Sequence, residues 1–326
     1  MADQPPVVME PSATFRRLVP VDRLAPPVTP SGDVYVIAHM GVARVDGAQW
    51  RLRVDGLVDR PLELDYDALI ALRATEVTAV LECFGNPVEP EVPTRRVGNV
   101  VWRGVQLAHL LGGAGVRPEA QVVCLEGLDS GTFAGVRSDR YMKDLPLARA
   151  LEPDVVVAWA MNGEPLTQEH GFPARLFVPG YFGTNAVKWL SRLTLAAERP
   201  EGLFTTRLYN RRVDGEWRPV RELDVHAVIV TPAHGVSLRP GRHAVEGWAW
   251  SAWPVRLVEV SVDGGATWRP ARVAARGADH QWQKFAYPWD AAPGGHELHV
   301  RATDERGRTQ PGTGRNRVHT ISVSVA

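Results

Sequence analysis

The chain has 326 residues, a length that favours two domains over a single core. Its hydrophobic fraction of 44% and charged fraction of 23% are those of an ordinary globular protein. Lysine plus arginine and aspartate plus glutamate both total 37, so the charge balance excludes an obvious nucleic acid partner. No stretch approaches the roughly 20 apolar residues that a membrane helix needs, so no membrane segment is expected.

The chain has two cysteines, Cys83 and Cys124, which cannot build a disulfide framework and lack the CxxC spacing of zinc sites. Metal chemistry would therefore use one thiolate at most, or histidines and carboxylates. The N-terminus has neither a basic nor an apolar leader segment. As it stands the sequence predicts a cytoplasmic protein, with a periplasmic location as the alternative if a leader has been removed.

Short elements are expected in the first part of the chain. Residues 1–32 are rich in proline and predict an extended arm over the surface. Residues 50–56 alternate and end in Asp-Gly, which predicts a strand and a turn. Residues 65–72 have helical spacing after an N-cap aspartate, and residues 105–111 predict a second short helix, with a strand over residues 76–83 between them.

The following segments read mainly as strands. Residues 122–125 and 155–159 are β-branched runs bounded by turn residues, which is typical of buried strands in a mixed sheet. Residues 174–195 are apolar but contain two glycines at the centre, which favours strand, loop and strand over one long helix. Together these elements predict an α+β domain over residues 33–199.

The character of the sequence changes after residue 199. We expect a linker over residues 200–227. Over residues 228–326, alternating runs separated by Asp-Gly-Gly, Pro-Gly-Gly and Arg-Gly turns predict an all-β immunoglobulin-like sandwich. The large side chains for its core would come from five tryptophans, Trp248, Trp250, Trp268, Trp282 and Trp289.

Cys83 stands in the segment LECFGNP, where a strand leads into a Gly-Asn-Pro turn and leaves the sulfur at the tip of a loop. A thiolate there could ligate a soft metal or act as a nucleophile. Free cysteine is nevertheless more often a small buried hydrophobic residue. Cys124, inside the run VVCLEG, has only this second interpretation.

Three further loops carry polar groups between apolar strands. EGLDSG contains Asp129 and EHGFP contains His170, and these side chains are either ligand contacts or ordinary turn residues. VPGYFGTNAVKW offers backbone N–H groups and the cation Lys188, which suits a phosphate, or a structural turn before a strand. Residue chemistry alone leaves these alternatives open.

Taken in this order, the segments resemble the sulfite oxidase family of molybdenum enzymes, which includes plant assimilatory nitrate reductase. The matches cover most of the chain from about residue 33 to residue 311. They are YVIAH at Tyr35, CFGN at Cys83, VGNVVWRGVQL at Val97, EGLDS at Glu126, AMNGEPLTQEHGFPARLFVPGYFGTNAVKWL at Ala160, and GWAWS, VEVSVDGGATW and RATDERGRTQP in the sandwich. Motifs that are weak alone become specific in this order.

The resemblance implies that one pterin dithiolene and one cysteine thiolate hold molybdenum, and Cys83 falls on that cysteine. The positions that contact this molybdopterin fall on Tyr35, His39, Asp129, His170, Arg175, Ala186, Val187 and Lys188. It also implies a homodimer formed through the C-terminal domain and an enzyme that transfers an oxygen atom in a two-electron step. No haem segment matches this chain, so electrons would pass to a separate partner such as a c-type cytochrome.

The chain departs from the family pattern in three motifs. Ile37, and Pro87 with Val88, stand where sulfite oxidases carry arginines. Trp159, which we predict as a catalytic position beside Cys83, stands at the active-site tyrosine. Because each charge-assisted hydrogen bond contributes roughly 1.5 to 3 kcal/mol, the loss of two cations should weaken the binding of a sulfite dianion.

The sequence therefore predicts a molybdenum oxidoreductase for a small molecule or small anion, with sulfite oxidation as the family's usual reaction. Reduction of a less charged S-oxide or N-oxide is the alternative that the apolar replacements favour. A cofactor-binding homologue without turnover and an adhesion module built on the sandwich are further alternatives. Arg95 and Arg96 are expected to form a solvated loop pair, or else to approach the pocket from another side.

Overall fold

The computed structural model describes residues 7–9, 14–87 and 93–326. The chain divides into two compact units that are not contiguous in sequence. The first takes in Val36–Val77 and Val101–Arg221, with the described residues before Leu18. The second takes in Leu18–Tyr35, Glu222–Ala326 and the described part of Thr78–Val100. Cys83 thus belongs to the same unit as the C-terminal segment, and the contiguous domain ranges expected above stay a prediction.

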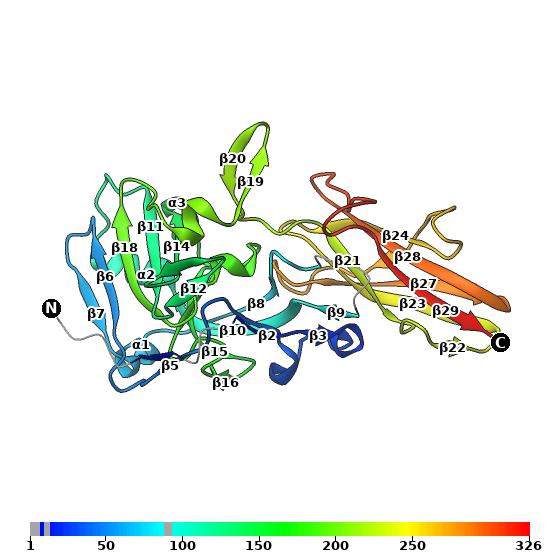
Figure 1. Ribbon diagram of the computed structural model, residues 1–326, viewed down its shortest axis with the longest axis horizontal. Coiled ribbons are helices and arrows are strands. Elements are labelled where there is room, and N and C mark those ends of the chain that lie inside the picture. The colour runs from blue at the N-terminus through cyan, green and yellow to red at the C-terminus, as the bar shows by residue number, and fades with distance from the viewer. Residues whose placement is uncertain (1–6, 10–13, 88–92) are drawn as a thin grey trace. The chain divides into compact units, whose positions relative to one another are not determined.

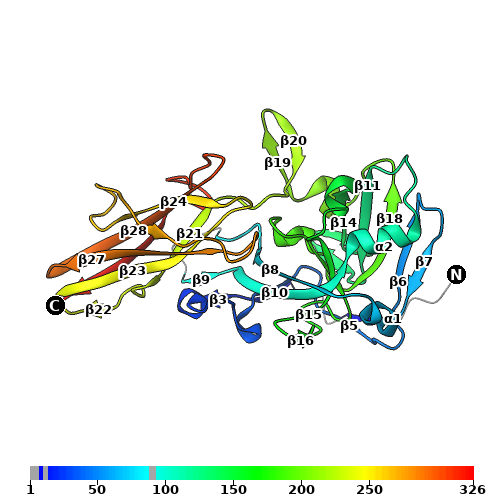
Figure 2. The ribbon, with the colours of Figure 1, turned by 180° about the vertical axis from the view of Figure 1, so that it is seen from behind.

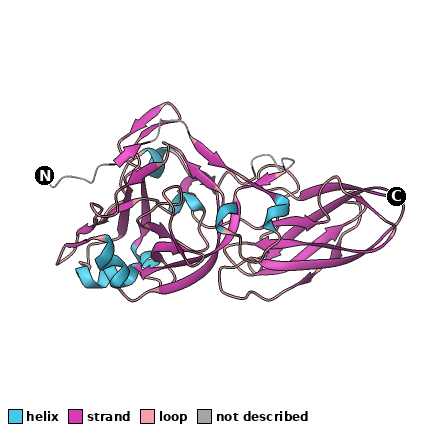
Figure 3. Cartoon of the chain, turned by 90° about the horizontal axis from the view of Figure 1, so that it is seen from below, coloured by secondary structure: helices cyan, strands magenta, loops and turns pink. Residues whose placement is uncertain are grey.

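Strands dominate both units (Figure 3). In the described residues the α-helices are three short ones, α1 (Tyr66–Ala71), α2 (Leu107–Ala114) and α3 (Leu147–Ala150). The helices are few and short, as expected, but the protein is mostly β, so the predicted α+β class fits it only in part. No helix in the described ranges is long and apolar enough to cross a membrane.

One sheet of the first unit has five strands. Their order is β14 (Met142–Pro146), β11 (Val122–Gly127), β18 (Leu190–Ala196), β6 (Leu52–Gly56) and β7 (Leu62–Leu64). The β18–β6 pair is parallel and the other neighbours are antiparallel. Alternation along β6 buries Leu52 and Val54 completely, as it does Trp50 just before the strand. The strands predicted over residues 50–56 and 122–125 are confirmed.

A second sheet carries the loops of the candidate site. Its order is β16 (Glu164–Pro165), β15 (Val156–Met161), β10 (Val97–Gln106) and β8 (Thr75–Glu82), and β17 (Arg175–Phe177) also pairs with β15. These bounds confirm the strands predicted over residues 76–83 and 155–159. With the 3-10 turn η3 (Gly183–Asn185), β17 and β18 also confirm strand, loop and strand over residues 174–195.

The two predicted helices of this unit are present. The side chain of Asp65 accepts a 2.8 Å hydrogen bond from the backbone nitrogen of Ala68, as an N-cap residue should, and α1 follows it. The second helix, α2, begins at Leu107 rather than at Val105. The reason is that Val105 still pairs with Val157 of β15.

The second unit contains two sheets whose side chains share one core. One sheet has the order β21 (His226–Thr231), β23 (Gly241–Trp250), β27 (Gln283–Ala291) and β26 (Arg272–Val273). The other has the order β22 (Ser237–Leu238), β29 (His319–Val325), β28 (Gly294–Asp304), β24 (Val255–Ser261) and β25 (Arg269–Pro270). Val245 and Phe285 from the first sheet and Leu298 and Ile321 from the second lie in the same buried cluster.

In the described residues, five further short elements lie outside the predicted arm and linker. They are β4 (Val36–Ala38), β5 (Ala43–Val45), β9 (Thr94–Arg95), β12 (Gly131–Phe133) and β13 (Val136–Ser138).

The segments that were expected to be an arm and a linker contain regular structure. In and directly after the arm, the described residues form β1 (Val7–Met9), β2 (Phe15–Arg17), β3 (Val19–Pro20), η1 (Val21–Leu24) and η2 (Ser31–Asp33). Within residues 200–227 a π-helical turn, η4 (Leu203–Arg207), precedes a hairpin of β19 (Asn210–Val213) and β20 (Glu216–Pro219). This hairpin extends from the first unit (Figures 1 and 2).

Candidate functional site

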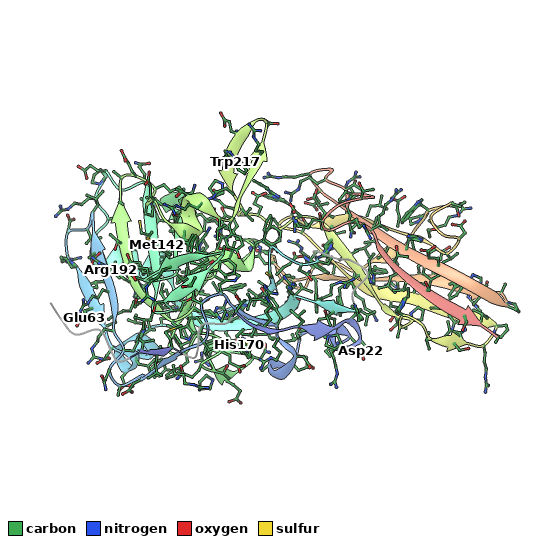
Figure 4. The ribbon with its side chains drawn as sticks, viewed as in Figure 1. Asp22, Glu63, Met142, His170, Arg192 and Trp217 are labelled. Carbon is green, nitrogen blue, oxygen red and sulfur yellow. The ribbon has the colours of Figure 1, made fainter. Side chains whose placement is uncertain are left out.

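His170, Arg175 and Lys188 come together in the first unit. The Arg175 side chain donates hydrogen bonds from Nη1 to the backbone oxygen of His170 at 3.1 Å and from Nη2 to that of Ala186 at 3.4 Å. Lys188 Nζ donates to the backbone oxygen of Glu169 at 2.9 Å. We call His170, Arg175 and Lys188 the cationic cluster after its two cations, Arg175 and Lys188; Figure 4 labels His170.

Arg17 joins this cluster, although sequence reasoning did not single it out. Its Nη1 donates to Glu169 Oε2 at 2.7 Å, and its Nη2 lies 3.3 Å from His170 Nε2. Arg17 is held in place because β2 pairs with β4, with Arg17 opposite Val36. An arginine in a proline-rich segment carries no motif, so this contact had no sequence signal.

The cationic cluster holds basic groups largely out of water. Burial lowers the pKa of His170 to about 3, with Arg175, Lys188 and Arg17 adding to the effect. Burial and Arg175 also lower the pKa of Lys188. Burial raises the pKa of Asp129, although Lys188 opposes that rise. Cations held out of water are costly without a counter-charge, so a bound anion would stabilise this arrangement.

Two buried polar atoms beside the cluster lack a hydrogen-bond partner. Asp129 is 4% exposed, and its Oδ1 accepts no hydrogen bond. The Trp102 ring, whose centroid lies 4.8 Å from the Arg175 guanidinium carbon, has an unpartnered Nε1–H. Buried polar groups are normally satisfied, so one acceptor and one donor are open to a ligand. With the cations, they fit the phosphate and the heteroatoms of a molybdopterin.

The segment that carries Lys188 requires close backbone approach. Gly171 has φ of 103°, and a Cβ built on it would lie 2.9 Å from the Cβ of Lys188. Its backbone oxygen accepts a 3.3 Å hydrogen bond from the backbone nitrogen of Trp189. A glycine is therefore needed at this position both for its dihedral angle and for space.

The predicted backbone contacts at Ala186 and Val187 are only in part free for a ligand. The amide of Ala186 donates to the backbone oxygen of Gly183 at 3.1 Å, which closes the η3 turn. The backbone oxygen of Val187 accepts from Leu176 at 2.9 Å, and the Val187 side chain is completely buried in the core. This turn therefore offers less to an anion than the side chains of Arg175 and Lys188 do.

His39 lies in an aromatic cluster of the first unit. The Tyr209 hydroxyl is 2.5 Å from His39 Nε2, and the rings of Phe133 and Phe204 lie 4.2 and 5.9 Å from the His39 ring, centroid to centroid. Tyr209 and Phe204 come from the segment predicted as a linker. Sequence reasoning missed them because no spacing connects this segment with residue 39.

The other predicted positions lie as follows. Trp159 is buried in β15 and belongs to the core of the first unit, while Ile37 is half-buried in β4. Tyr35 is buried and belongs to the second unit. Pro87 is buried, and Val88 lies outside the described residues. The roles assigned to Tyr35 and Trp159 stay predictions.

Cys83 is half-buried in the second unit and follows β8 directly, where the chain turns as expected. Its backbone nitrogen donates to the backbone oxygen of Arg96 at 2.9 Å, and its Sγ accepts a 3.4 Å hydrogen bond from Gly85. Burial raises the pKa of the Cys83 thiol, while the Gly85 amide and Arg96 oppose the rise. Cys124 is buried in β11, where desolvation raises its pKa to about 11.

The expectation of a solvated pair at Arg95 and Arg96 is wrong for Arg95. Its side chain is 2% exposed, because β9 pairs with β3 and places Arg95 opposite Val19. Burial lowers its pKa to about 10. Arg96 is half-buried and holds the Cys83 turn through its backbone.

Comparison with known proteins places these residues in a family. The model of the oxidoreductase molybdopterin binding domain matches residues 39–204, and that of the Mo-co oxidoreductase dimerisation domain matches residues 218–323. The nitrate reductase [NAD(P)H] of Hordeum vulgare is 32% identical, over 87% of this chain and 37% of that protein. The mitochondrial sulfite oxidase of Homo sapiens is 32% identical, over 88% of this chain and 58% of that protein.

A solved structure is similar over nearly the whole chain. The sulfane dehydrogenase SoxCD of Paracoccus pantotrophus superposes with a TM-score of 0.83 at 29% identity, covering 97% of this chain and 86% of that one. The chain spans only 37% and 58% of the two curated relatives named above. The family match and the relatives support a molybdenum–molybdopterin cofactor. The chain belongs to the sulfite oxidase family of molybdopterin-binding oxidoreductases.

Proposed function

We propose that this chain is a molybdenum-dependent oxidoreductase that moves an oxygen atom between water and a small substrate. The observation that carries the proposal is the cationic cluster, with the unpartnered atoms of Asp129 and Trp102 beside it. When bound, the molybdenum–pterin group would supply the two-electron redox chemistry.

The chain's own residues would bind and orient that group. Arg175 and Lys188, with His170 kept neutral by its low pKa, would hold the anionic end of the pterin. Asp129 Oδ1 would accept a hydrogen bond from it, and Trp102 Nε1 would donate one. The Cys83 thiolate would be the protein ligand to the metal, since a thiolate suits a soft site. These roles follow from the family resemblance together with the contacts within each unit.

For the substrate, we propose a small sulfur compound whose reacting sulfur carries less charge than sulfite. Ile37, Pro87 and Trp159 stand where the sulfite oxidases carry polar residues, so these positions offer no cation to a dianion. The likeness to a protein named as a sulfane dehydrogenase supports the same class. In the oxidation, water supplies the oxygen that bonds to sulfur, and two electrons and two protons leave. An external redox protein such as a c-type cytochrome would accept the electrons.

The apolar positions also favour a second candidate, the reverse reaction on an S-oxide or N-oxide. In that case an external donor supplies two electrons, and the oxygen leaves as water after taking up two protons. We further propose that residues 228–326 form an immunoglobulin-like domain through which two copies associate, which the dimerisation-domain match supports. Light scattering of the purified chain measures this state directly.

Steady-state assays of the cofactor-loaded chain test the proposal. We expect saturable oxidation of a sulfane-bearing compound with ferricyanide or cytochrome c, and a higher KM for sulfite. A low KM together with a high kcat for sulfite would contradict the proposed substrate class. Turnover only with reduced dye and an S-oxide or N-oxide would support the second candidate. A loaded protein inert to every donor and acceptor would support a binding protein without turnover instead.

A further inference from the structure

A buried polar network ties the Cys83 turn to the C-terminal segment of the second unit. Glu82, directly before Cys83, is 2% exposed. Its Oε1 accepts a 3.0 Å hydrogen bond from Asn86 Nδ2, and its Oε2 accepts a 2.8 Å hydrogen bond from Trp250 Nε1. His226 Nδ1 lies 3.3 Å from Glu82 Oε1. The carboxylate is thus held by one group from its own turn and one from the C-terminal segment of the unit.

Asn86 extends this network around the turn. Its Oδ1 accepts a 2.7 Å hydrogen bond from the backbone nitrogen of Arg96, and its own backbone nitrogen donates to the backbone oxygen of Cys83 at 2.9 Å. The Cys83 amide in turn donates to the backbone oxygen of Arg96. Residues 83 and 86 are therefore both fixed to Arg96, and Glu82 fixes Asn86.

A second tie reaches the turn from Arg315. Its Nη1 donates to the backbone oxygen of Phe84 at 2.9 Å, and its guanidinium carbon lies 4.3 Å from the centroid of the Phe84 ring. The same side chain pairs with Asp224. The planar, forked guanidinium makes these three contacts at once, which an ammonium group cannot reproduce.

The hydrogen bonds of Glu82 and Asn86 favour one local conformation of the turn, because breaking any of them leaves a buried polar group unpaired. We infer that Glu82, Trp250 and Arg315 are positioning residues that fix the Cys83 sulfur for metal ligation. The segment matched as a dimerisation domain, which includes Trp250 and Arg315, thereby takes part in building the metal site. This inference rests on the proposed function in one respect, the role of Cys83 as ligand.

Two variants with matched controls test it in the full-length chain. Trp250→Phe removes the indole N–H that donates a hydrogen bond to Glu82. Its control is Trp248→Phe. Trp248 lies on the same strand, is also buried, and donates its indole N–H to the backbone oxygen of Leu24 at 2.7 Å. Both substitutions replace a buried indole with a phenyl ring, so the loss of packing is similar in both.

Arg315→Lys is the second test. Arg315 is less buried than Trp250, so this variant should fold even if Trp250→Phe does not. Its control is Arg301→Lys. Arg301 also pairs with a carboxylate, that of Glu259 at 2.8 Å, and stacks 4.2 Å from the Trp268 ring centroid. It makes these contacts away from the Cys83 turn.

Hydrogen exchange of the peptide spanning residues 80–87 reports the mobility of the turn. We expect exchange roughly fivefold faster in Trp250→Phe and Arg315→Lys than in their controls, the effect of one lost hydrogen bond on a local opening equilibrium. X-ray absorption at the molybdenum edge should show a smaller fraction of metal with the protein sulfur ligand in the same two variants. Equal exchange in each variant and its control would overturn the inference.

The same two measurements separate this inference from the proposed function. If wild-type protein carries molybdenum without a cysteine sulfur, the role of Cys83 as ligand fails, and with it the purpose assigned to the network. If the sulfur is present but the variants and controls exchange alike, the ligand stands and the network is not what positions it.

Discussion

The guanidinium carbon of Arg175 lies 4.8 Å from the centroid of the Trp102 ring, and the group's two terminal nitrogens reach the backbone oxygens of His170 and Ala186. This arrangement uses the planar face of the guanidinium group, its paired N–H donors and its permanent charge at the same time. It orients a cation within the buried cluster, next to an indole N–H that has no partner.

Arg175→Lys should therefore lower the retention of the pterin. A lysine keeps the charge but loses the fork and the stacking, and a charge-assisted hydrogen bond contributes roughly 1.5 to 3 kcal/mol, which corresponds to at least about a tenfold change in affinity. The fluorescence of oxidised pterin released per chain measures the effect.

Arg149→Lys is the matched control for this variant. Arg149 also donates two hydrogen bonds from its guanidinium group, both to the carboxylate of Asp154. Its guanidinium carbon also lies over an aromatic ring, 5.5 Å from the centroid of Tyr181. It should lose stability but not pterin. Equal pterin content in the two variants would argue against an anion site at Arg175.

Cys83→Ser should abolish turnover while part of the pterin stays bound. The hydroxyl is a poor replacement for a thiolate at a soft metal, whereas the contacts of the cationic cluster are unaffected. Metal and pterin content, measured beside activity, separate the two effects. Cys124→Ser is the control, and wild-type turnover in Cys83→Ser would refute the assignment.

The local structure around Cys83 was predictable from sequence, because a strand followed by Gly-Asn-Pro specifies a turn. The long-range contacts that hold this turn in place were not predictable. Glu82 and Trp250 are separated by 168 positions, and no periodicity links them. Arg95 illustrates the same limit in the other direction. A charged residue in a loop predicts exposure, but the β3–β9 pairing buries it.

The cationic cluster was predictable only through the resemblance. From residue chemistry, His170 and Lys188 were as consistent with turn residues as with ligand contacts, because the alternatives differ in what lies nearby rather than in the sequence itself. Arg17 had no signal at all. Its role depends on the pairing of β2 with β4, which an arm rich in proline does not predict.

Gly171→Ala should destabilise the loop beside Lys188 by about 1 to 3 kcal/mol, the usual cost of a strained backbone position. Its φ of 103° disfavours an L-residue, and the added Cβ would press against the Lys188 side chain. Gly163→Ala is the control, since Gly163 has φ of 85° with no atom within 4 Å of the added Cβ. The midpoint temperature of thermal unfolding and the pterin content per chain should both fall further in Gly171→Ala than in Gly163→Ala. Equal losses would mean that the crowding at Lys188 carries no cost.

The buried state of His170 should make the chain less stable in mild acid when no anion is bound. Its pKa of about 3 in the folded protein is lower than the usual 6.5 of a histidine in water, so below pH 6.5 the unfolded chain binds a proton that the folded chain does not. The contribution of His170 is fully present above pH 6.5 and is lost as the pH falls toward 3. The loss approaches about 1.4 kcal/mol per pH unit for a single proton. Denaturant unfolding of cofactor-free protein at several pH values measures this slope, and His170→Asn should reduce it by about one proton. An unchanged slope in His170→Asn would mean that His170 already takes up its proton in the folded chain, and that the cluster around it is not the desolvated cationic site described above.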